Sequence, residues 1–127
     1  MEYETGKIDK GWGFEIAFAN NNDYSGKLLV FERAGAKTSM MFHKKRRKTW
    51  WVNEGKFKLT YIDTQTGRLH ESILDIGKTA TLGEMCPHQL EALEPNSVIF
   101  EVGTGDEGNI DRVRLGPGDT QTKQSAQ

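Results

Sequence analysis

Apolar side chains recur at every second position in several segments of the chain, and this alternation limits the fold more than any other feature. The clearest segments are Trp12–Phe18, Phe57–Tyr61 and Val98–Val102. A period of two is typical of β-strands that bury one face, whereas amphipathic helices repeat every 3.6 residues. No stretch combines helical spacing over about ten residues with a helix cap. We therefore predict an all-β chain.

Short polar clusters separate the alternating segments and indicate turns. They are Asn20–Asp23, Arg33–Gly35, Asn53–Gly55, Gln65–Gly67 and Glu94–Asn96, whose Gly, Asn, Asp and Pro residues are typical of turns. About eight short strands at intervals of about 8 to 12 residues are typical of a sandwich or barrel. The chain has 127 residues, which suits one domain.

The composition narrows the class of protein. Lys and Arg total 17 against 18 Asp and Glu, a net charge of -1 that excludes a globally basic nucleic-acid-binding protein. Cys86 is the single cysteine, which favours a reducing compartment. Met1–Lys10 carries acids and lysines rather than the apolar stretch of a signal peptide, and no apolar run approaches the about 20 residues that span a bilayer. We expect a cytoplasmic protein with no nucleic-acid or membrane partner.

Several motifs, in order along the chain, resemble those of sugar-active cupins. The matching segments are Gly11–Glu15, Lys27–Val30, Gly35–Ser39, Ser39–Gly55, Pro87–His88, Phe100–Val102 and Asp111–Arg114. The long block Ser39–Gly55 is similar to the metal-site strand pair of type II mannose-6-phosphate isomerases and of the C-terminal domain of mannose-1-phosphate guanylyltransferases.

The resemblance implies a fold and an assembly. It implies a single-domain cupin jelly-roll barrel over residues 1–115 with a ligand pocket in its mouth. Residues 116–127 are expected to form a flexible C-terminal tail, because residues 120–127 are polar and lack an apolar anchor. Small cupins often pair through sheet augmentation, so a homodimer is expected by analogy.

The resemblance also implies positions for metal ligands. His43 and His88 match the family's two motif histidines, while Lys45 and Lys48 stand where the family has His and Glu, and Met41 stands where the sugar isomerases have Gln. A divalent cation such as Zn, Mn, Fe or Ni needs three or four converging donors. A lysine ammonium has no lone pair to donate. His43 and His88 therefore form an incomplete metal-ligand set.

Three functions remain open at this point. The first is a sugar-phosphate or nucleotide-sugar isomerase or epimerase, in which His43 or His88 removes a proton beside a carbonyl and Lys45 or Lys48 stabilises the enolate. The second is a non-catalytic cupin that binds a small anionic sugar or acid. In both, Lys45 and Lys48 bind the substrate by charge-assisted hydrogen bonds, together with Met41 and Trp50. The substrate itself stays unknown.

The third function is a small metal-binding cupin with an altered ligand set. Glu84 and Cys86 lie near His88 in the sequence and are the candidates to replace the lost donors. Cys86 and His88 share a face only if the segment between them is extended. A divalent metal is thus a possible cofactor, and the alternative is a polar pocket without metal.

The run Lys-Lys-Arg-Arg-Lys at residues 44–48 concentrates positive charge beside this site. Charge runs are commonly solvated, but strand alternation divides this one. If His43 points inward, Lys45 points inward too and its neighbours point outward. Lys48 and Trp50 share the other parity, which requires a bulge near residues 46–47, and bulges are common beside active sites.

Overall fold

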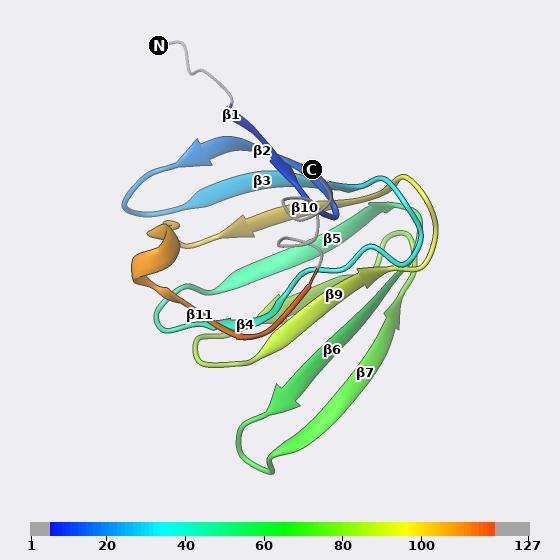
Figure 1. The fold of residues 1–127 in the computed structure, drawn as a ribbon. Coiled ribbons are helices and arrows are strands. Elements are labelled where there is room, and N and C mark those ends of the chain that lie inside the picture. The colour runs from blue at the N-terminus through cyan, green and yellow to red at the C-terminus, as the bar shows by residue number, and fades with distance from the viewer. Residues whose placement is uncertain (1–5, 119–127) are drawn as a thin grey trace.

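Eleven strands form two antiparallel sheets that face each other in the computed structural model of the chain, which describes residues 6–118 (Figure 1). The strands are β1 (Gly6–Lys10), β2 (Gly13–Asn20), β3 (Ser25–Phe31), β4 (Met40–His43), β5 (Lys48–Glu54), β6 (Phe57–Asp63), β7 (Arg68–Leu74), β8 (Thr79–Leu82), β9 (His88–Ala92), β10 (Ser97–Gly103) and β11 (Arg112–Gly116). The larger sheet has the order β1-β2-β3-β10-β5-β8 and the smaller one β11-β4-β9-β6-β7. The predicted all-β, single-domain jelly roll is confirmed.

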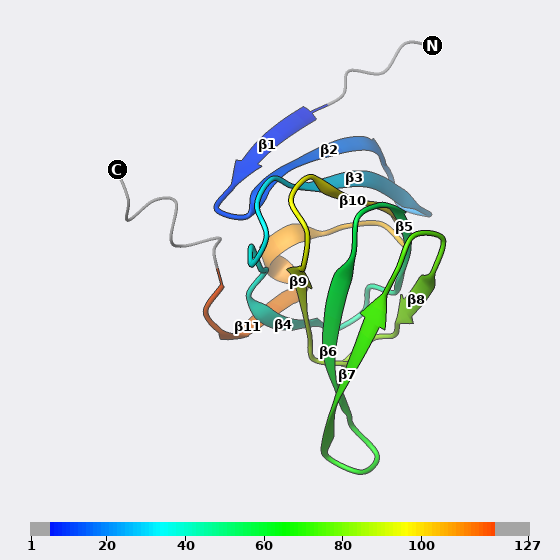
Figure 2. The ribbon, with the colours of Figure 1, turned by 90° about the vertical axis from the view of Figure 1, so that its right-hand side faces the viewer.

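The predicted turns connect these strands. In the β2–β3 turn the side-chain oxygen of Asn21 accepts hydrogen bonds from the backbone N–H groups of Asp23 and Tyr24 at 2.8 and 3.0 Å, which is how Asn stabilises a turn. Gly67 ends the β6–β7 turn with φ of +72°, a conformation that favours glycine. Figures 1 and 2 show this β6–β7 hairpin extending beyond the rest of the barrel.

Two of the alternating segments form strands as predicted, but their more apolar face points away from the barrel interior. Glu15 of β2 and Glu101 of β10 line the interior pocket. The alternate positions, including Phe18, Phe100 and Val102, lie on the outer face and are exposed. The period of two thus located the strands correctly. In these two strands, however, the interior of the barrel is lined by polar side chains, so the apolar face that was expected to be buried lies outside.

Aromatic side chains join the two sheets and adjoin the pocket. Trp12 stacks on Phe31 with ring centroids 4.3 Å apart, and Phe31 contacts the edge of Phe57 at 5.1 Å. Trp12 and Trp50 belong both to the buried core and to the pocket wall. The pocket is therefore held by the same packing that stabilises the barrel, which makes its wall rigid.

Two predictions concern the C-terminal tail and the absence of membrane-spanning segments. The predicted flexible tail at residues 116–127 lies outside the described residues except for its first three, and Gly116 still belongs to β11. Within residues 6–118 no helix has the length and apolar character needed to cross a membrane.

Candidate functional site

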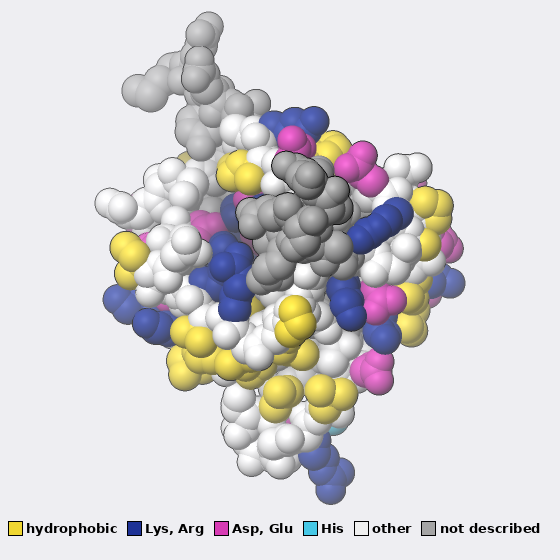
Figure 3. Space-filling model, in the orientation of Figure 1, with side chains coloured by type: hydrophobic (Ala, Val, Ile, Leu, Met, Phe, Trp, Pro, Cys, Tyr) yellow, Lys and Arg dark blue, Asp and Glu magenta, His cyan; other side chains and the backbone are white. Residues whose placement is uncertain are grey.

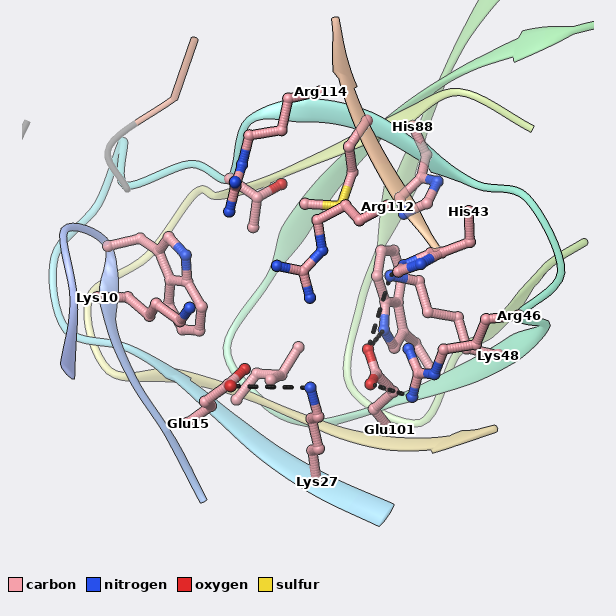
Figure 4. A pocket seen from close by; sticks show the side chains of 15 residues that line it. Lys10, Glu15, Lys27, His43, Arg46, Lys48, His88, Glu101, Arg112 and Arg114 are labelled. Carbon is pink, nitrogen blue, oxygen red and sulfur yellow. Dashed lines mark hydrogen bonds and ion pairs between the residues drawn. The ribbon is translucent and has the colours of Figure 1, made fainter. Parts of the chain in front are cut away.

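A pocket with a cavity volume of about 60 Å³ lies between the two sheets (Figure 4). Six cationic side chains line it against two carboxylates: Lys10, Lys27, Arg46, Lys48, Arg112 and Arg114 against Glu15 and Glu101. In the space-filling view, Lys and Arg side chains gather left of centre on the face that carries β11 (Figure 3). The wall of the pocket is therefore strongly cationic, although the whole chain is nearly neutral.

The structure brings most of the predicted site residues together in this pocket. Met41 and His43 come from β4, Lys48 and Trp50 from β5, and His88 from β9. Within each strand, alternate positions point to one face, and Met41 pairs directly with His88 across β4 and β9. These five side chains therefore converge from three strands.

Lys45 is the exception, and its predicted inward orientation is wrong. Lys45 is exposed, whereas Arg46 is buried and lines the pocket. Strand β4 ends at His43 and β5 begins at Lys48, so the residues between them form a loop. Alternation holds only along an extended strand, and no β-bulge is needed to bring Lys48 inward.

Asp111 holds this loop in place. Its carboxylate accepts hydrogen bonds from the backbone N–H groups of Lys45 and Arg46, at 2.7 and 3.2 Å. The carboxylate also lies 3.4 Å from Nδ1 of His43. Because Asp111 is buried, its negative charge acts in a low dielectric. It therefore fixes the turn that separates the outward Lys45 from the inward Arg46.

Glu101 is the buried centre of the pocket's charge network. One carboxylate oxygen accepts from the indole N–H of Trp50 at 2.8 Å, and the other pairs with Arg46 at 2.9 Å. Lys48 Nζ lies 3.9 Å from the same carboxylate. Burial alone raises the pKa of Glu101, but the nearby cations Lys48, Arg46 and Lys27 outweigh burial and lower this pKa to about 2. The carboxylate is therefore ionised at neutral pH.

His43 and His88 are both neutral at physiological pH. Burial, followed by the charge of Lys48, lowers the pKa of His43 to about 4 and that of His88 well below its ordinary value. Nε2 of His43 lies 3.4 Å from Nζ of Lys48. We assign the proton of His43 to Nδ1, which faces Asp111, so that Nε2 accepts from the ammonium.

His88 presents an unused lone pair. Its Nδ1 lies 2.9 Å from the backbone oxygen of Cys86, so Nδ1 carries the proton and Nε2 is left as an acceptor. This Nε2 is fully buried and has no hydrogen-bond partner among the described residues. Buried polar atoms are nearly always satisfied. The lone pair of this nitrogen is therefore available to accept a hydrogen bond from a water or a bound molecule.

Three cations at the pocket form no ion pair with the described part of the chain. Arg112 and Arg114 stand at alternate positions of β11, and Figure 4 shows the guanidinium of Arg112 pointing into the pocket, with Lys10 across from it. Within residues 6–118, none of these three side chains forms an ion pair, and Arg112 Nε is buried without a hydrogen bond. Burial lowers the pKa of Arg114, and the charge of Arg112 lowers it further.

The residues present do not fit a divalent metal ion of the kind that the cupin resemblance implies. The described part of the chain contains no group of three or more His, Cys, Asp or Glu side chains arranged to hold one. The Lys48 ammonium lies against Nε2 of His43, which is one of the two matched ligands. The proposed replacements do not help, because Glu84 is exposed on another part of the surface and Cys86 donates to the backbone oxygen of Ile62 at 3.7 Å.

Sequence reasoning did not assign a role to Arg46, Glu101, Arg112 or Arg114. A signal for Glu101 existed, since it is the one acid inside an otherwise apolar strand, and such an acid requires a buried partner. The alternation of Arg112 and Arg114 around Val113 was visible too. What the alternation did not show was that β11 pairs with β4, which carries His43 and Met41.

No protein-family model and no curated protein matches the sequence. Solved structures match the fold. Oxalate decarboxylase from Bacillus subtilis is 18% identical with a TM-score of 0.76, over 88% of this chain and 30% of its own. KdgF from Halomonas sp. is 18% identical with a TM-score of 0.69, over 85% of this chain and 91% of its own. CapF is 14% identical with a TM-score of 0.77, over 91% of this chain and 35% of its own.

These similarities establish the cupin fold that the sequence motifs implied. The chain spans only about a third of the length of oxalate decarboxylase and of CapF. At such low identities, a shared fold does not carry a shared activity. None of these three structures is a mannose-6-phosphate isomerase, so the resemblance to that family stays a prediction.

Proposed function

We propose that this cupin barrel binds a small organic anion, of the sugar-acid, sugar-phosphate or short carboxylic-acid class, in the pocket between its sheets. The observation that carries the proposal is that Lys10, Arg112 and Arg114 line the pocket and form no ion pair within residues 6–118. Like charges that face one another in a partly buried site repel, and a bound carboxylate or phosphate relieves the repulsion. The hydrogen bonds it accepts are charge-assisted and about twice as strong as neutral ones.

The size of the pocket favours a small ligand. About 60 Å³ of cavity has room for only a few water-sized groups, at about 10 to 15 Å³ for each. A carboxylate or phosphate with a few attached carbons suits this volume. The name of oxalate decarboxylase, which acts on a small dianion, gives support at the level of the fold alone.

The test is a titration of the full-length, isotope-labelled chain with phosphate, oxalate and galacturonate, followed by the NMR shifts of backbone amides. We expect shifts at β4, β9 and β11 and none with the neutral sugar galactose. Arg114→Gln removes one guanidinium and should weaken binding at least about 10-fold. Arg68→Gln is the matched control, because Arg68 lies at the exposed start of β7, and it should leave binding unchanged. Equal binding of galactose and galacturonate, or equal effects of the two substitutions, would overturn the proposal.

A second candidate is proton transfer beside a carbonyl, the reaction of a sugar isomerase. The observation that favours it is the unpartnered Nε2 of His88, a neutral base in a pocket that also contains the Lys48 ammonium. In this reaction the C–H bond next to the carbonyl breaks and its proton moves to Nε2. The electron pair moves onto the carbonyl oxygen, which Lys48 stabilises as an enolate. A proton then moves from the hydroxyl group on the deprotonated carbon to the enolate oxygen, which becomes a hydroxyl group. The new C=O bond forms on the deprotonated carbon while Nε2 returns its proton to the former carbonyl carbon, and this completes the isomerisation.

Exchange of the substrate's carbon-bound proton with solvent deuterium tests this second function. Sugar phosphates and keto-sugar nucleotides are incubated with the protein in deuterium oxide and followed by proton NMR. We expect loss of the proton signal beside the carbonyl with the wild type and no loss with His88→Gln, which cannot act as a base. If no compound of these classes exchanges, the isomerase function fails while anion binding still stands.

A further inference from the structure

Lys48 is buried in the pocket among His43, Glu101 and Trp50, which is an unusual environment for a lysine. Its side chain is buried, with only 7% of the residue exposed. The Nζ atom lies 3.4 Å from His43 Nε2, 3.9 Å from Glu101 Oε1 and 5.0 Å from the centre of the Trp50 ring. A lone pair, a carboxylate and an aromatic face are the three kinds of group that attract a cation. The protein therefore surrounds this ammonium with cation-binding groups.

The same groups include the donors that a metal ion would use. His43 and His88 face the pocket with ring centroids 6.2 Å apart, and Glu101 lies on the adjacent strand β10, which pairs with β5. A divalent ion placed among these side chains would meet the Lys48 ammonium at close range. At about 4 Å the repulsion between two unit charges is about 4 kcal/mol at an effective dielectric of about 20, and it is doubled for a dication.

The carboxylate of Glu101 already binds other side chains of the protein. Glu101 already binds Arg46 and the Trp50 indole, so its oxygens are not free to coordinate a metal. The lone pair of His43 Nε2 faces Lys48. Among the imidazole lone pairs that line the pocket, that of His88 Nε2 is the one without a partner within residues 6–118, and one imidazole does not hold a divalent ion.

We infer that the Lys48 ammonium is the resident cation of this barrel, taking the place that a metal ion would need and excluding it. The negative charge of Glu101 and the lone pair of His43 are thereby satisfied without a metal ion. The Lys48 ammonium excludes a metal ion whether or not an anion binds to the arginines of β11.

The test compares metal binding by the tag-free wild type, Lys48→Glu and Lys45→Glu. Lys48→Glu removes the ammonium and adds a carboxylate donor between His43 and Glu101. We expect it to bind one Co²⁺ per chain at least about 100-fold more tightly than the wild type, with the visible absorption of a protein-bound cobalt ion. Lys45→Glu changes the net charge equally but lies outside the pocket, so it should bind as weakly as the wild type. His43→Ala in the Lys48→Glu background should abolish the gain.

Lys48→Glu places two carboxylates close together, so this variant can fail to fold, and a second variant is therefore tested. Lys48→Gln is neutral and keeps an oxygen donor, and it should still bind Co²⁺ about 10-fold more tightly than the wild type. Folding of each variant is checked by circular dichroism. Two results would overturn the inference: one Co²⁺ per wild-type chain that is lost in His43→Ala, or folded variants at Lys48 that bind no more tightly than the wild type. Neither result bears on anion binding, which is measured separately with Arg114→Gln.

Discussion

Nζ of Lys48 lies 3.4 Å from Nε2 of His43, with both side chains buried in the pocket between the two sheets. An ammonium beside an imidazole is stable only if the imidazole is neutral, and burial together with Lys48 lowers the pKa of His43 to about 4. Burial lowers the pKa of Lys48 itself to about 8, and the opposing charge of Glu101 limits that fall. Lys48 thus stays largely protonated at neutral pH, and the pocket keeps a fixed positive charge.

The residues of the basic run 44–48 should contribute very differently to the free energy of unfolding. Arg46→Ala removes a buried guanidinium that binds Glu101 and the hydroxyl of Ser25, and it should lower the free energy of unfolding by about 3–5 kcal/mol. Lys45→Ala removes an exposed side chain and should change this free energy by less than about 0.5 kcal/mol. Urea unfolding measures both. Equal losses would contradict the placement of the two side chains.

Glu101→Gln should destabilise the barrel strongly. The substitution keeps the shape of the side chain but leaves Arg46 and Lys48 buried without their counter-charge, which costs about 3–5 kcal/mol of the free energy of unfolding. Asp75→Asn is the control, since its pair with Lys56 is solvent-exposed, and it should leave the melting temperature unchanged. Thermal unfolding of both variants checks the prediction, and a wild-type melting temperature for Glu101→Gln would refute it.

Acid should remove the contribution of Glu101 to stability. The folded pKa of about 2 lies below the about 4.3 of a glutamate in an unfolded chain. A lowered folded pKa means that the contribution is fully present above about pH 4.3 and is lost as the pH falls toward 2. The difference in free energy of unfolding between wild type and Glu101→Gln, measured in urea from pH 6 to pH 3, should therefore shrink with falling pH. A constant difference would contradict this pKa.

Gly13→Ala should disrupt the start of β2. Gly13 has φ of +150°, and an added Cβ would lie 1.9 Å from the backbone oxygen of Val30 in the paired strand β3. Since a backbone atom cannot yield cheaply, we expect a loss of more than about 2 kcal/mol in the free energy of unfolding. Gly83→Ala is the control, because nothing lies within 4 Å of its added Cβ. Similar urea midpoints for the two variants would argue against this close approach.

Anion binding should weaken as salt increases. Lys10, Arg112 and Arg114 line an open pocket, and ions in solution screen such charges, with a Debye length of about 10 Å at 0.1 M. Raising the NaCl concentration from about 20 to about 500 mM should weaken galacturonate binding about 10-fold in an NMR titration. Arg114→Gln should show a smaller dependence on salt. Binding that does not respond to salt would indicate that the ligand is held by neutral groups.

The sequence predicted much of the fold because the relevant signals are local. Alternation and turn residues are properties of a few neighbouring positions, so the strands around Phe57–Tyr61 and the turn at Gln65–Gly67 were located correctly. The resemblance to cupin motifs singled out three of the side chains that line the pocket, His43, Lys48 and His88. Their convergence followed once the strands paired.

The charge partners could not be predicted in the same way. Arg46 and Glu101 are 55 positions apart in the sequence, and their contact depends on β10 pairing with β5. Whether Lys45 or Arg46 turns inward depends on where β4 stops, and Asp111 fixes that loop from the far end of the chain. A local pattern carries no information about either contact.

By itself, the sequence determined that this chain is all-β and where several of its strands and turns lie. These outcomes depend on side-chain alternation and on turn chemistry, which act over a few residues. Only the tertiary structure decided which charged side chains form the pocket. It brought the arginines of β11 beside His43 and Met41, surrounded Lys48 with His43 and Glu101, and turned Lys45 out to solvent. Electrostatic interactions act through space, so their balance is set by strand pairing and burial and not by order along the chain.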